Sequence, residues 1–298
     1  MTTLPIPESA RALLDAAVDY AGLFPPAALS MTAAVAEYAR AVASPEAWML
    51  GRFVLPVGRL TEFGAAHQGA PRPAAWRLSA LVSADAAADA ETVAVFHAQP
   101  GELARVDAVE SKPAQLDEVD ALAERWPGLD VYVEVATSTA PAPWLARIAA
   151  RRLGAKIRTG GVTADAFPTP EAVVMFLAAA VNAGVRFKAT AGLHHALRGS
   201  YRLTYQPDAD SAPMYGYLNV LLATAALRAG LDQAVAEEIL VCADPSSLTF
   251  TDAGLRWRGV TFPTALLRAT RAEHLVGFGS CSFREPATEL RPLLGSPS

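Results

Sequence analysis

The most constraining feature of the sequence is a regular alternation of short β-rich runs with alanine-rich helical stretches. The first seven β-rich runs begin 24 to 33 residues apart, a spacing that fits one strand, one helix and their connections. Strands separated by helices favour a parallel sheet, because a parallel connection has to cross back over that sheet. The eight runs are 19–24 (DYAGLF), 52–57 (RFVLPV), 76–83 (WRLSALVS), 105–111 (RVDAVES), 130–136 (DVYVEVA), 155–161 (AKIRTGG), 185–192 (VRFKATAG) and 275–282 (LVGFGSCS).

Eight such units predict a single α/β domain over residues 1–298, a (β/α)8 TIM barrel that begins with an N-terminal helix. An open, doubly wound sheet is the alternative, but no glycine-rich dinucleotide fingerprint follows the first run. The helix over 169–184 illustrates the pattern, with Pro170 near its start and Gly184 past its end.

The interval after the seventh run is too long for one connection, and we expect an insertion over about 197–262. It contains an apolar helical stretch at 212–230, a second helix at 231–244 and a hairpin at 247–259 that turns at 252–254. The insertion would form either a lid or an oligomer surface, so a homo-oligomer is one expectation.

Charge and cysteine content limit the classes of function. A net charge of -5 without a basic run argues against a nucleic-acid partner, and no uninterrupted apolar segment is long enough for a membrane span. Only two cysteines are present, without paired spacing, and the N-terminus lacks the pattern of a secretory signal. We expect a cytoplasmic enzyme or binding protein without a metal or other cofactor.

Lysine is rare in this chain. Of 25 basic residues only Lys112, Lys156 and Lys188 are lysine, and the rest are arginine. A desolvated lysine can lose its proton and act as a nucleophile, whereas arginine stays protonated in proteins. Lys112 stands beside Pro113 at a strand end and is expected to be a solvated surface residue.

Strand alternation places several charged side chains on shared faces near the carboxyl ends of the strands, where barrel active sites lie. Lys156 shares a face with Arg158 on the sixth run, and Lys188 shares one with Thr190 on the seventh. On the fourth run Asp107 aligns with Val109 and Ser111, and on the fifth Glu134 aligns with Tyr132. Such charges are costly if buried alone, so we expect them to meet at the mouth of the barrel.

Two ammonium groups on neighbouring strands should lower one another's pKa and free an amine. That amine could attack a carbonyl group and form a Schiff base, an electron sink for making or breaking carbon–carbon bonds. Asp107 or Glu134 would move the required protons.

The same segments resemble the deoxyribose-phosphate aldolase family of class I, Schiff-base aldolases, with this chain as a divergent member. AKIRTGG is similar to the motif with the Schiff-base lysine, here Lys156, and FKATAGLHH is similar to the motif of the lysine that perturbs it, here Lys188. RVDAVE resembles the segment whose aspartate transfers protons, which gives Asp107. Similar segments surround Asp19, Glu134 and the GFGSCS end of the last run, where the family binds phosphate. The resemblance implies a barrel and a metal-independent aldehyde-lyase.

The sequence departs from that family where the substrate would bind. Arg158 replaces a small hydroxyl residue, Ala191 interrupts a Gly-Gly pair and Cys281 replaces a serine. Either a phosphate, held by backbone N–H groups, or a carboxylate, paired with an arginine, fits these residues. We therefore expect a small, anionic carbonyl compound. The expected substrate-binding residues are Asp19, Glu134, Arg158, Thr159, Gly160, Gly161, Thr190, Gly192, His194, His195, Arg198, Ser280 and Ser282.

Other functions stay open at this stage. A Schiff-base dehydratase or isomerase would use the same lysine, and a catalytically silent barrel would only bind a small molecule. The adjacent His194 and His195 could suggest a metal, but consecutive residues of an extended chain point to opposite sides. Cys281 has no obvious neighbouring base to activate it, so a packed thiol is expected there.

Overall fold

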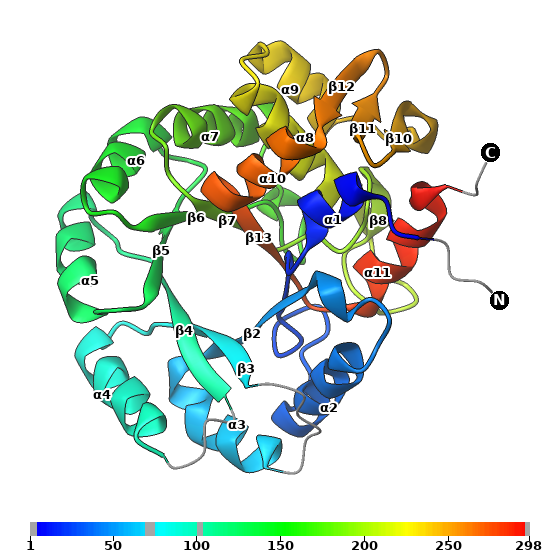
Figure 1. Cartoon of the computed structure of the whole chain (residues 1–298). Helices are drawn as coiled ribbons and strands as arrows, with labels where there is room; N and C mark the ends of the chain where they lie inside the picture. The colour runs from blue at the N-terminus through cyan, green and yellow to red at the C-terminus, as the bar shows by residue number, and fades with distance from the viewer. Residues whose placement is uncertain (1–4, 69–74, 100–103, 296–298) are drawn as a thin grey trace.

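A closed, eight-stranded parallel barrel forms the centre of the molecule. The computed structural model describes residues 5–68, 75–99 and 104–295. Around the barrel the strands follow the order β1, β2, β3, β4, β5, β6, β7 and β13, and β13 closes on β1. Figure 1 shows this barrel along its axis, inside a ring of helices. The strands are β1 (Val18–Tyr20), β2 (Leu50–Pro56), β3 (Trp76–Leu81), β4 (Ala104–Ser111), β5 (Asp130–Val135), β6 (Gly154–Arg158), β7 (Phe187–Thr190) and β13 (Leu275–Ser280).

The predicted TIM barrel is therefore confirmed, and each of the eight predicted runs overlaps a barrel strand. The strands are almost continuously buried because helices cover their outer face and side chains fill the interior. The helices are α1 (Glu8–Leu14), α2 (Met31–Val42), α3 (Leu60–His67), α4 (Ala86–His97), α5 (Val119–Arg125), α6 (Pro141–Ala150), α7 (Pro170–Asn182), α8 (Tyr217–Arg228), α9 (Gln233–Leu240), α10 (Thr264–Glu273) and α11 (Arg284–Leu290).

Local sequence signals set the helix ends. In α7, Thr169 accepts a hydrogen bond from the backbone N–H of Ala172, Pro170 takes the first helical position, and Gly184 follows the helix with a φ of +63°. By length and composition the helical segment Ala164–Asn182 could span a membrane, but here it packs against α6, α8 and α9 as an outer helix of the barrel.

The segment between β7 and β13 differs partly from the predicted insertion. The hairpin that turns at 252–254 is present as β10 (Leu248–Phe250) and β11 (Gly254–Trp257), to which β12 (Val260–Pro263) adds a third strand. The stretch 212–230 is not helical throughout. Its start belongs to β9 (Ser211–Met214), which pairs with β8 (Gly199–Arg202).

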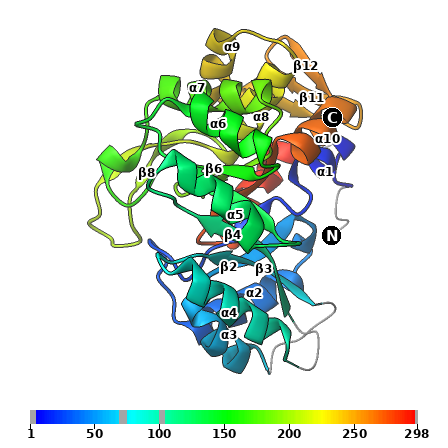
Figure 2. The ribbon, with the colours of Figure 1, turned by 90° about the vertical axis from the view of Figure 1, so that its left-hand side faces the viewer.

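Within this segment α8 belongs to the wall of the barrel. It packs against α7, α10 and β13, so it fills the place of the outer helix between the last two strands. Figure 2 shows the β8–β9 hairpin projecting from one end of the barrel, while α1 lies at the other. Because the hairpin follows β7, its end of the barrel is the carboxyl end of the strands, where active sites of this fold lie.

Charged side chains also occupy the opposite, amino end of the barrel. Arg52 donates hydrogen bonds to Asp107 at 2.6 Å and to Asp130 at 3.0 Å. Arg77 pairs with Asp107, and Arg186 pairs with Asp130. This network closes the amino end with ion pairs instead of apolar side chains.

Gly216 gives a direct test of how α8 is seated. A Cβ atom at Gly216 would lie 2.3 Å from the Cα of Leu197 and 2.5 Å from the carbonyl oxygen of Ala196. Because backbone atoms cannot move aside easily, we expect Gly216→Ala to lower the free energy of unfolding by about 1–3 kcal/mol. The measurement is chemical denaturation.

The matched control is Gly259→Ala, because nothing lies within 4 Å of the added atom. Equal stabilities of the two variants would show that the contact between α8 and the loop before β8 is loose.

Candidate active site

Two buried lysines lie side by side inside the barrel near the carboxyl ends of β6 and β7. The strand register pairs Lys156 with Lys188, and pairs Lys156 with Glu134 of β5 on its other side. In parallel strands, register partners point in the same direction, so all three side chains enter the barrel at one level. The predicted proximity of the two lysines is thus present in the structure.

Glu110 of β4 lies between the two ammonium groups and binds both. Its Oε2 is 3.0 Å from the Nζ of Lys156, and its Oε1 is 3.1 Å from the Nζ of Lys188. The hydroxyl group of Ser79 donates to the same Oε1 at 2.8 Å and accepts from Lys188 at 2.9 Å. A single carboxylate therefore joins the two lysines.

Each lysine has a second carboxylate of its own. The Nζ of Lys156 lies 2.9 Å from Oε2 of Glu134, and the Nζ of Lys188 lies 2.7 Å from Oδ2 of Asp19. Lys112 reaches Oε1 of Glu134 at 3.2 Å, although 71% of its side chain is exposed as expected. All three lysines of the chain therefore meet three carboxylates in one network.

The expected lowering of a lysine pKa is wrong for this network. Burial alone lowers the pKa of Lys156, but the carboxylates of Glu110 and Glu134 outweigh burial and raise it above its usual range. Burial likewise lowers the pKa of Lys188, but Asp19 and Glu110 raise it further than burial lowers it. Both lysines are therefore ammonium ions at neutral pH.

The carboxylates show the opposite shifts. Burial raises the pKa of Glu110, but Lys188 and Lys156 hold it well below its usual range. Glu134 is also shifted down, since Lys156 outweighs its burial. Glu110 faces two ammonium groups within the barrel, so Glu134 is the more basic of the two carboxylates that contact Lys156.

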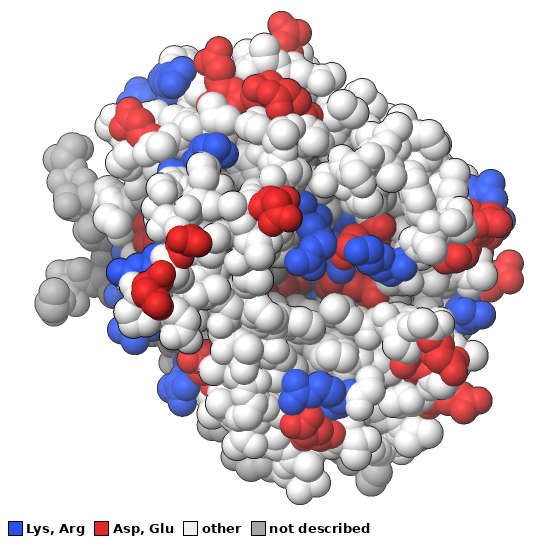
Figure 3. Space-filling model, turned by 180° about the vertical axis from the view of Figure 1, so that it is seen from behind, with Lys and Arg blue, Asp and Glu red and all other residues white. Residues whose placement is uncertain are grey.

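A cavity of about 290 Å³ opens above this network at the carboxyl ends of the strands. Figure 3 views that end of the molecule and shows a hollow in which Lys or Arg side chains meet Asp or Glu side chains. Predicted site residues that line the cavity are Asp19, Lys156, Arg158, Gly161, Thr190, Gly192 and His194. Phe24, Pro25, Val54 and Leu81 add apolar surface.

Among the described residues, Arg158 is the charged group of the cavity whose side chain has no partner. It follows Lys156 by two residues on β6 and is exposed at the mouth. In the described part of the chain its guanidinium makes neither an ion pair nor a hydrogen bond, whereas Asp19, Glu110 and Lys156 are all paired. An anionic group in the cavity would therefore find Arg158 available.

Asp107 does not belong to this site, and its predicted role in proton transfer is wrong. It pairs with Arg52 and Arg77 at the amino end of the barrel. The pairing of β3 with β4 shifts at this residue, since Leu78 aligns with Val106 but Ser79 aligns with Ala108. Such a bulge breaks strict alternation, so the residues after Asp107 do not follow the alternation counted from it.

Glu110 is the residue that sequence reasoning missed, together with Ser79. Strict alternation from Asp107 would place Glu110 on the opposite face of β4, and the bulge brings it into the barrel instead. The available signal was a second carboxylate in the apolar run RVDAVES, because a buried charge requires a partner.

Several predicted substrate-binding residues have structural partners instead of lining the cavity. Thr159 donates to the carbonyl oxygen of Ala191 at 2.8 Å, and Gly160 lies against Phe167, which a Cβ atom would strike at 2.4 Å. Ser282 accepts the backbone N–H of Glu285 at the start of α11.

The two adjacent histidines separate as expected. His194 lines the cavity, whereas Nδ1 of His195 lies 2.6 Å from Glu289 of α11 and its ring stacks on Tyr201. In the parts of the chain that the structure describes, no three His, Cys, Asp or Glu side chains are grouped to hold a metal ion.

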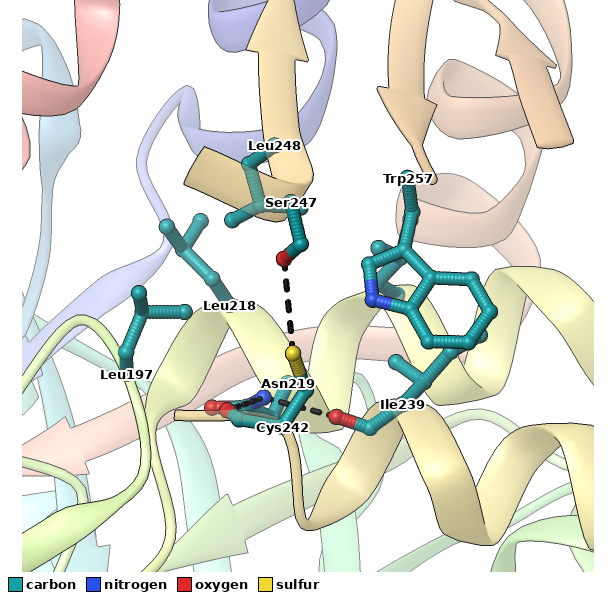
Figure 4. Close-up of a pocket in the computed structure, with 9 residues that line it drawn as sticks. Leu197, Leu218, Asn219, Ile239, Cys242, Ser247, Leu248 and Trp257 are labelled. Carbon is teal, nitrogen blue, oxygen red and sulfur yellow. Dashed lines mark hydrogen bonds between the residues drawn. The ribbon is translucent and has the colours of Figure 1, made fainter. Parts of the chain in front are cut away.

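Arg198 belongs to a different part of the fold. Its guanidinium lies over the ring of Tyr215, and its backbone N–H donates to Asn219 of α8. Asn219 in turn donates to the carbonyl oxygens of Ile239 and Cys242 and so ties α8 to α9 (Figure 4). The small pocket beside Asn219 has a free volume of about 10 Å³, about enough for one water molecule.

The shared carboxylate provides a stability test of this network. Glu110→Gln removes one anionic partner from each buried ammonium group while Glu134 and Asp19 remain, and a buried donor that loses a partner costs about 1–3 kcal/mol. We expect a loss of that size in the free energy of unfolding, measured by chemical denaturation at pH 7.

Glu62→Gln is the control, because Glu62 pairs with Arg59 at the surface and such pairs are screened by solvent. This variant should leave the free energy of unfolding unchanged. A Glu110→Gln protein as stable as the control would mean that the lysines do not depend on this carboxylate.

Neither a protein-family model nor a curated protein sequence matches this chain. The fold and the geometry of the cavity are therefore the basis for a functional proposal.

Proposed function

We propose that the protein is a lyase of the class I aldolase type, in which Lys156 forms a Schiff base with a small carbonyl compound and a carbon–carbon bond is then broken or formed. The observation that carries the proposal is the difference between the two lysines. Lys156 lines the cavity, whereas Lys188 lies below it with only 2% of its side chain exposed. A ligand in the cavity can therefore contact Lys156 while Lys188 stays bound to Asp19 and Glu110.

The ammonium group of Lys156 must lose a proton before it can attack. Glu134 is the acceptor that the geometry favours, because it lies 2.9 Å away and is more basic than Glu110. Proton transfer converts the pair of Lys156 and Glu134 from two ions to two neutral groups. A ligand that displaces water from the cavity favours this transfer, since a drier site stabilises charges less well.

The free amine then adds to the carbonyl carbon, and loss of water gives an iminium ion on Lys156. The next bond to break joins the α carbon, which is attached to the iminium carbon, to the β carbon. It breaks when a hydroxyl group on the β carbon gives up its proton. The electron pair of that bond moves to the iminium as an enamine, and the hydroxyl carbon leaves as an aldehyde. Protonation of the enamine and hydrolysis release the second fragment and restore Lys156.

Arg158 supports an anionic substrate. Its guanidinium is the unpaired cation at the cavity mouth within the described residues, two residues along β6 from Lys156. Residues two apart on a strand lie on one face about 6–7 Å from each other. A substrate with a carboxylate or phosphate a few bonds away from its carbonyl carbon would contact both side chains.

Binding without covalent chemistry is a second candidate, favoured by the raised pKa of Lys156. In that case the ion pairs with Glu110 and Glu134 would keep Lys156 protonated when a ligand is present. A Schiff-base dehydratase or isomerase would differ from the lyase in its products, because only the lyase releases two carbon fragments.

Borohydride trapping tests the proposal. The protein is incubated with acetone, pyruvate or dihydroxyacetone phosphate, reduced with borohydride and digested for mass spectrometry. We expect a stable adduct on the peptide that contains Lys156, at least tenfold above that on Lys188 or Lys112. The two anionic compounds should give more adduct than acetone, because Arg158 pairs with their charge.

Lys156→Arg should abolish the adduct, because arginine keeps the positive charge between Glu110 and Glu134 but has no nucleophilic amine. Lys112→Arg is the matched control and should retain the adduct. The absence of an adduct on Lys156 with all three compounds would contradict the proposed chemistry and favour the binding protein.

Glu134→Gln separates the two effects of this carboxylate on Lys156. Loss of an anion lowers the pKa of Lys156, so the free amine forms at a lower pH and the pH profile of trapping shifts to the acid side. Loss of the proton acceptor lowers the rate on the plateau of that profile. Trapping rates measured from pH 6 to pH 11 in the wild type and the variant give both quantities, and an unshifted midpoint would show that Glu134 does not stabilise the ammonium form.

A further inference from the structure

His194 faces the cavity because the chain turns sharply after β7. Ala191 and Gly192 both adopt the left-handed region, with φ values of +65° and +77°. Left-handed backbone costs about 1–2 kcal/mol for a residue with a side chain, so the surrounding structure must hold Ala191 there. After this turn Leu193 enters the core and His194 lines the same cavity as Lys156.

A chain of hydrogen bonds determines which nitrogen of His194 carries the proton. Nδ1 lies 3.1 Å from the hydroxyl oxygen of Ser280. That hydroxyl group donates its only proton to the carbonyl oxygen of Ser282 at 2.6 Å. Ser280 must therefore accept from His194, which places a hydrogen on Nδ1 and leaves a lone pair on Nε2.

The thiol of Cys281 lies nearer to another acceptor than to that lone pair. Its Sγ is 3.6 Å from Nδ1 and 4.0 Å from Nε2 of His194, but only 3.4 Å from the hydroxyl oxygen of Tyr205. The hydroxyl group of Tyr205 donates to Glu285, so its oxygen is free to accept from the thiol. Burial raises the pKa of Cys281 to about 11, which keeps the thiol protonated.

The imidazole is also neutral under ordinary conditions. Burial, with a smaller contribution from His195, lowers the pKa of His194 to about 4, and Glu289 opposes this only weakly. Glu289 is itself bound to His195 and to the backbone N–H of Ala196, which reduces its effect on His194.

We propose that His194 is the catalytic base of the site, with Nδ1 held by Ser280 and Nε2 open to a substrate attached to Lys156. Ser280 is a positioning residue, because it acts by fixing the tautomer and orientation of the ring. This inference rests on the proposed Schiff base at Lys156 and assigns the proton transfer that follows it.

In the cleavage direction Nε2 removes the proton of the substrate hydroxyl group as the carbon–carbon bond breaks. The electron pair of that bond moves to the iminium on Lys156, and the hydroxyl carbon becomes a carbonyl carbon. The imidazolium then returns its proton to the terminal carbon of the enamine, so no other reactant is consumed.

Nitrogen-15 NMR of the five histidines tests the tautomer in the protein without a ligand. We expect the signals of His194 to show a protonated Nδ1 and an unprotonated Nε2 that titrates only near pH 4. Ser280→Ala should allow the other tautomer to appear. A proton on Nε2 in the wild type would overturn the inference.

Exchange of carbon-bound hydrogen tests the catalytic role. In D2O the wild type should incorporate deuterium next to the carbonyl carbon of whichever compound gives the most trapped adduct. His194→Asn keeps an amide donor for Ser280 but has no base at the position of Nε2. We expect the exchange rate of this variant to fall about 100-fold or more, while the borohydride adduct on Lys156 is retained.

His97→Gln is the control, because His97 lies at the end of α4 and accepts a hydrogen bond from Val106 outside the cavity. The outcomes separate the two proposals. No adduct on wild-type Lys156 would contradict the Schiff base and this inference with it. An adduct with unchanged exchange in His194→Asn, or with no exchange in the wild type, would overturn the role of His194 alone.

Discussion

The carboxylate of Glu110, shared between two ammonium groups inside the barrel, is the interaction on which the site depends. Two buried positive charges on neighbouring strands repel each other, and neither Lys156 nor Lys188 could stay charged there alone. Glu110 binds both, and Asp19 and Glu134 each add one contact from the sides. The barrel therefore contains a neutralised layer of charges where an apolar layer is usual.

In the proposed reaction this layer of charges gives the two lysines different roles. Lys188 lies below the cavity, bound to Asp19 and Glu110, and its charge orients Glu110. Lys156 has one partner in common with Lys188 and one partner, Glu134, to which it can pass a proton. Above them the cavity offers Arg158 for an anionic group and His194 for proton transfer.

The sequence predicted those parts of the structure that follow from regular periodicity. Helix and strand periods placed all eight barrel strands, and the rarity of lysine identified Lys156 and Lys188 as residues of interest. The prediction was wrong where one extra residue interrupts the two-residue period of a strand, because the bulge at Asp107 reverses the face on which Glu110 lies. Polar pairing also depends on distances across the barrel that no single strand reveals. For that reason the pKa of Lys156 was expected to fall, whereas the carboxylates of Glu110 and Glu134 raise it.

Lysine NMR is the most direct test of this charge arrangement, since the chain has only three lysines. In protein labelled with carbon-13 lysine, a Lys→Arg variant at each position assigns the three signals. We predict that the Cε signals of Lys156 and Lys188 stay in the ammonium position up to pH 10 without a ligand. A change of either signal to that of a free amine below about pH 9 would contradict it, because an ordinary lysine titrates near pH 10.4.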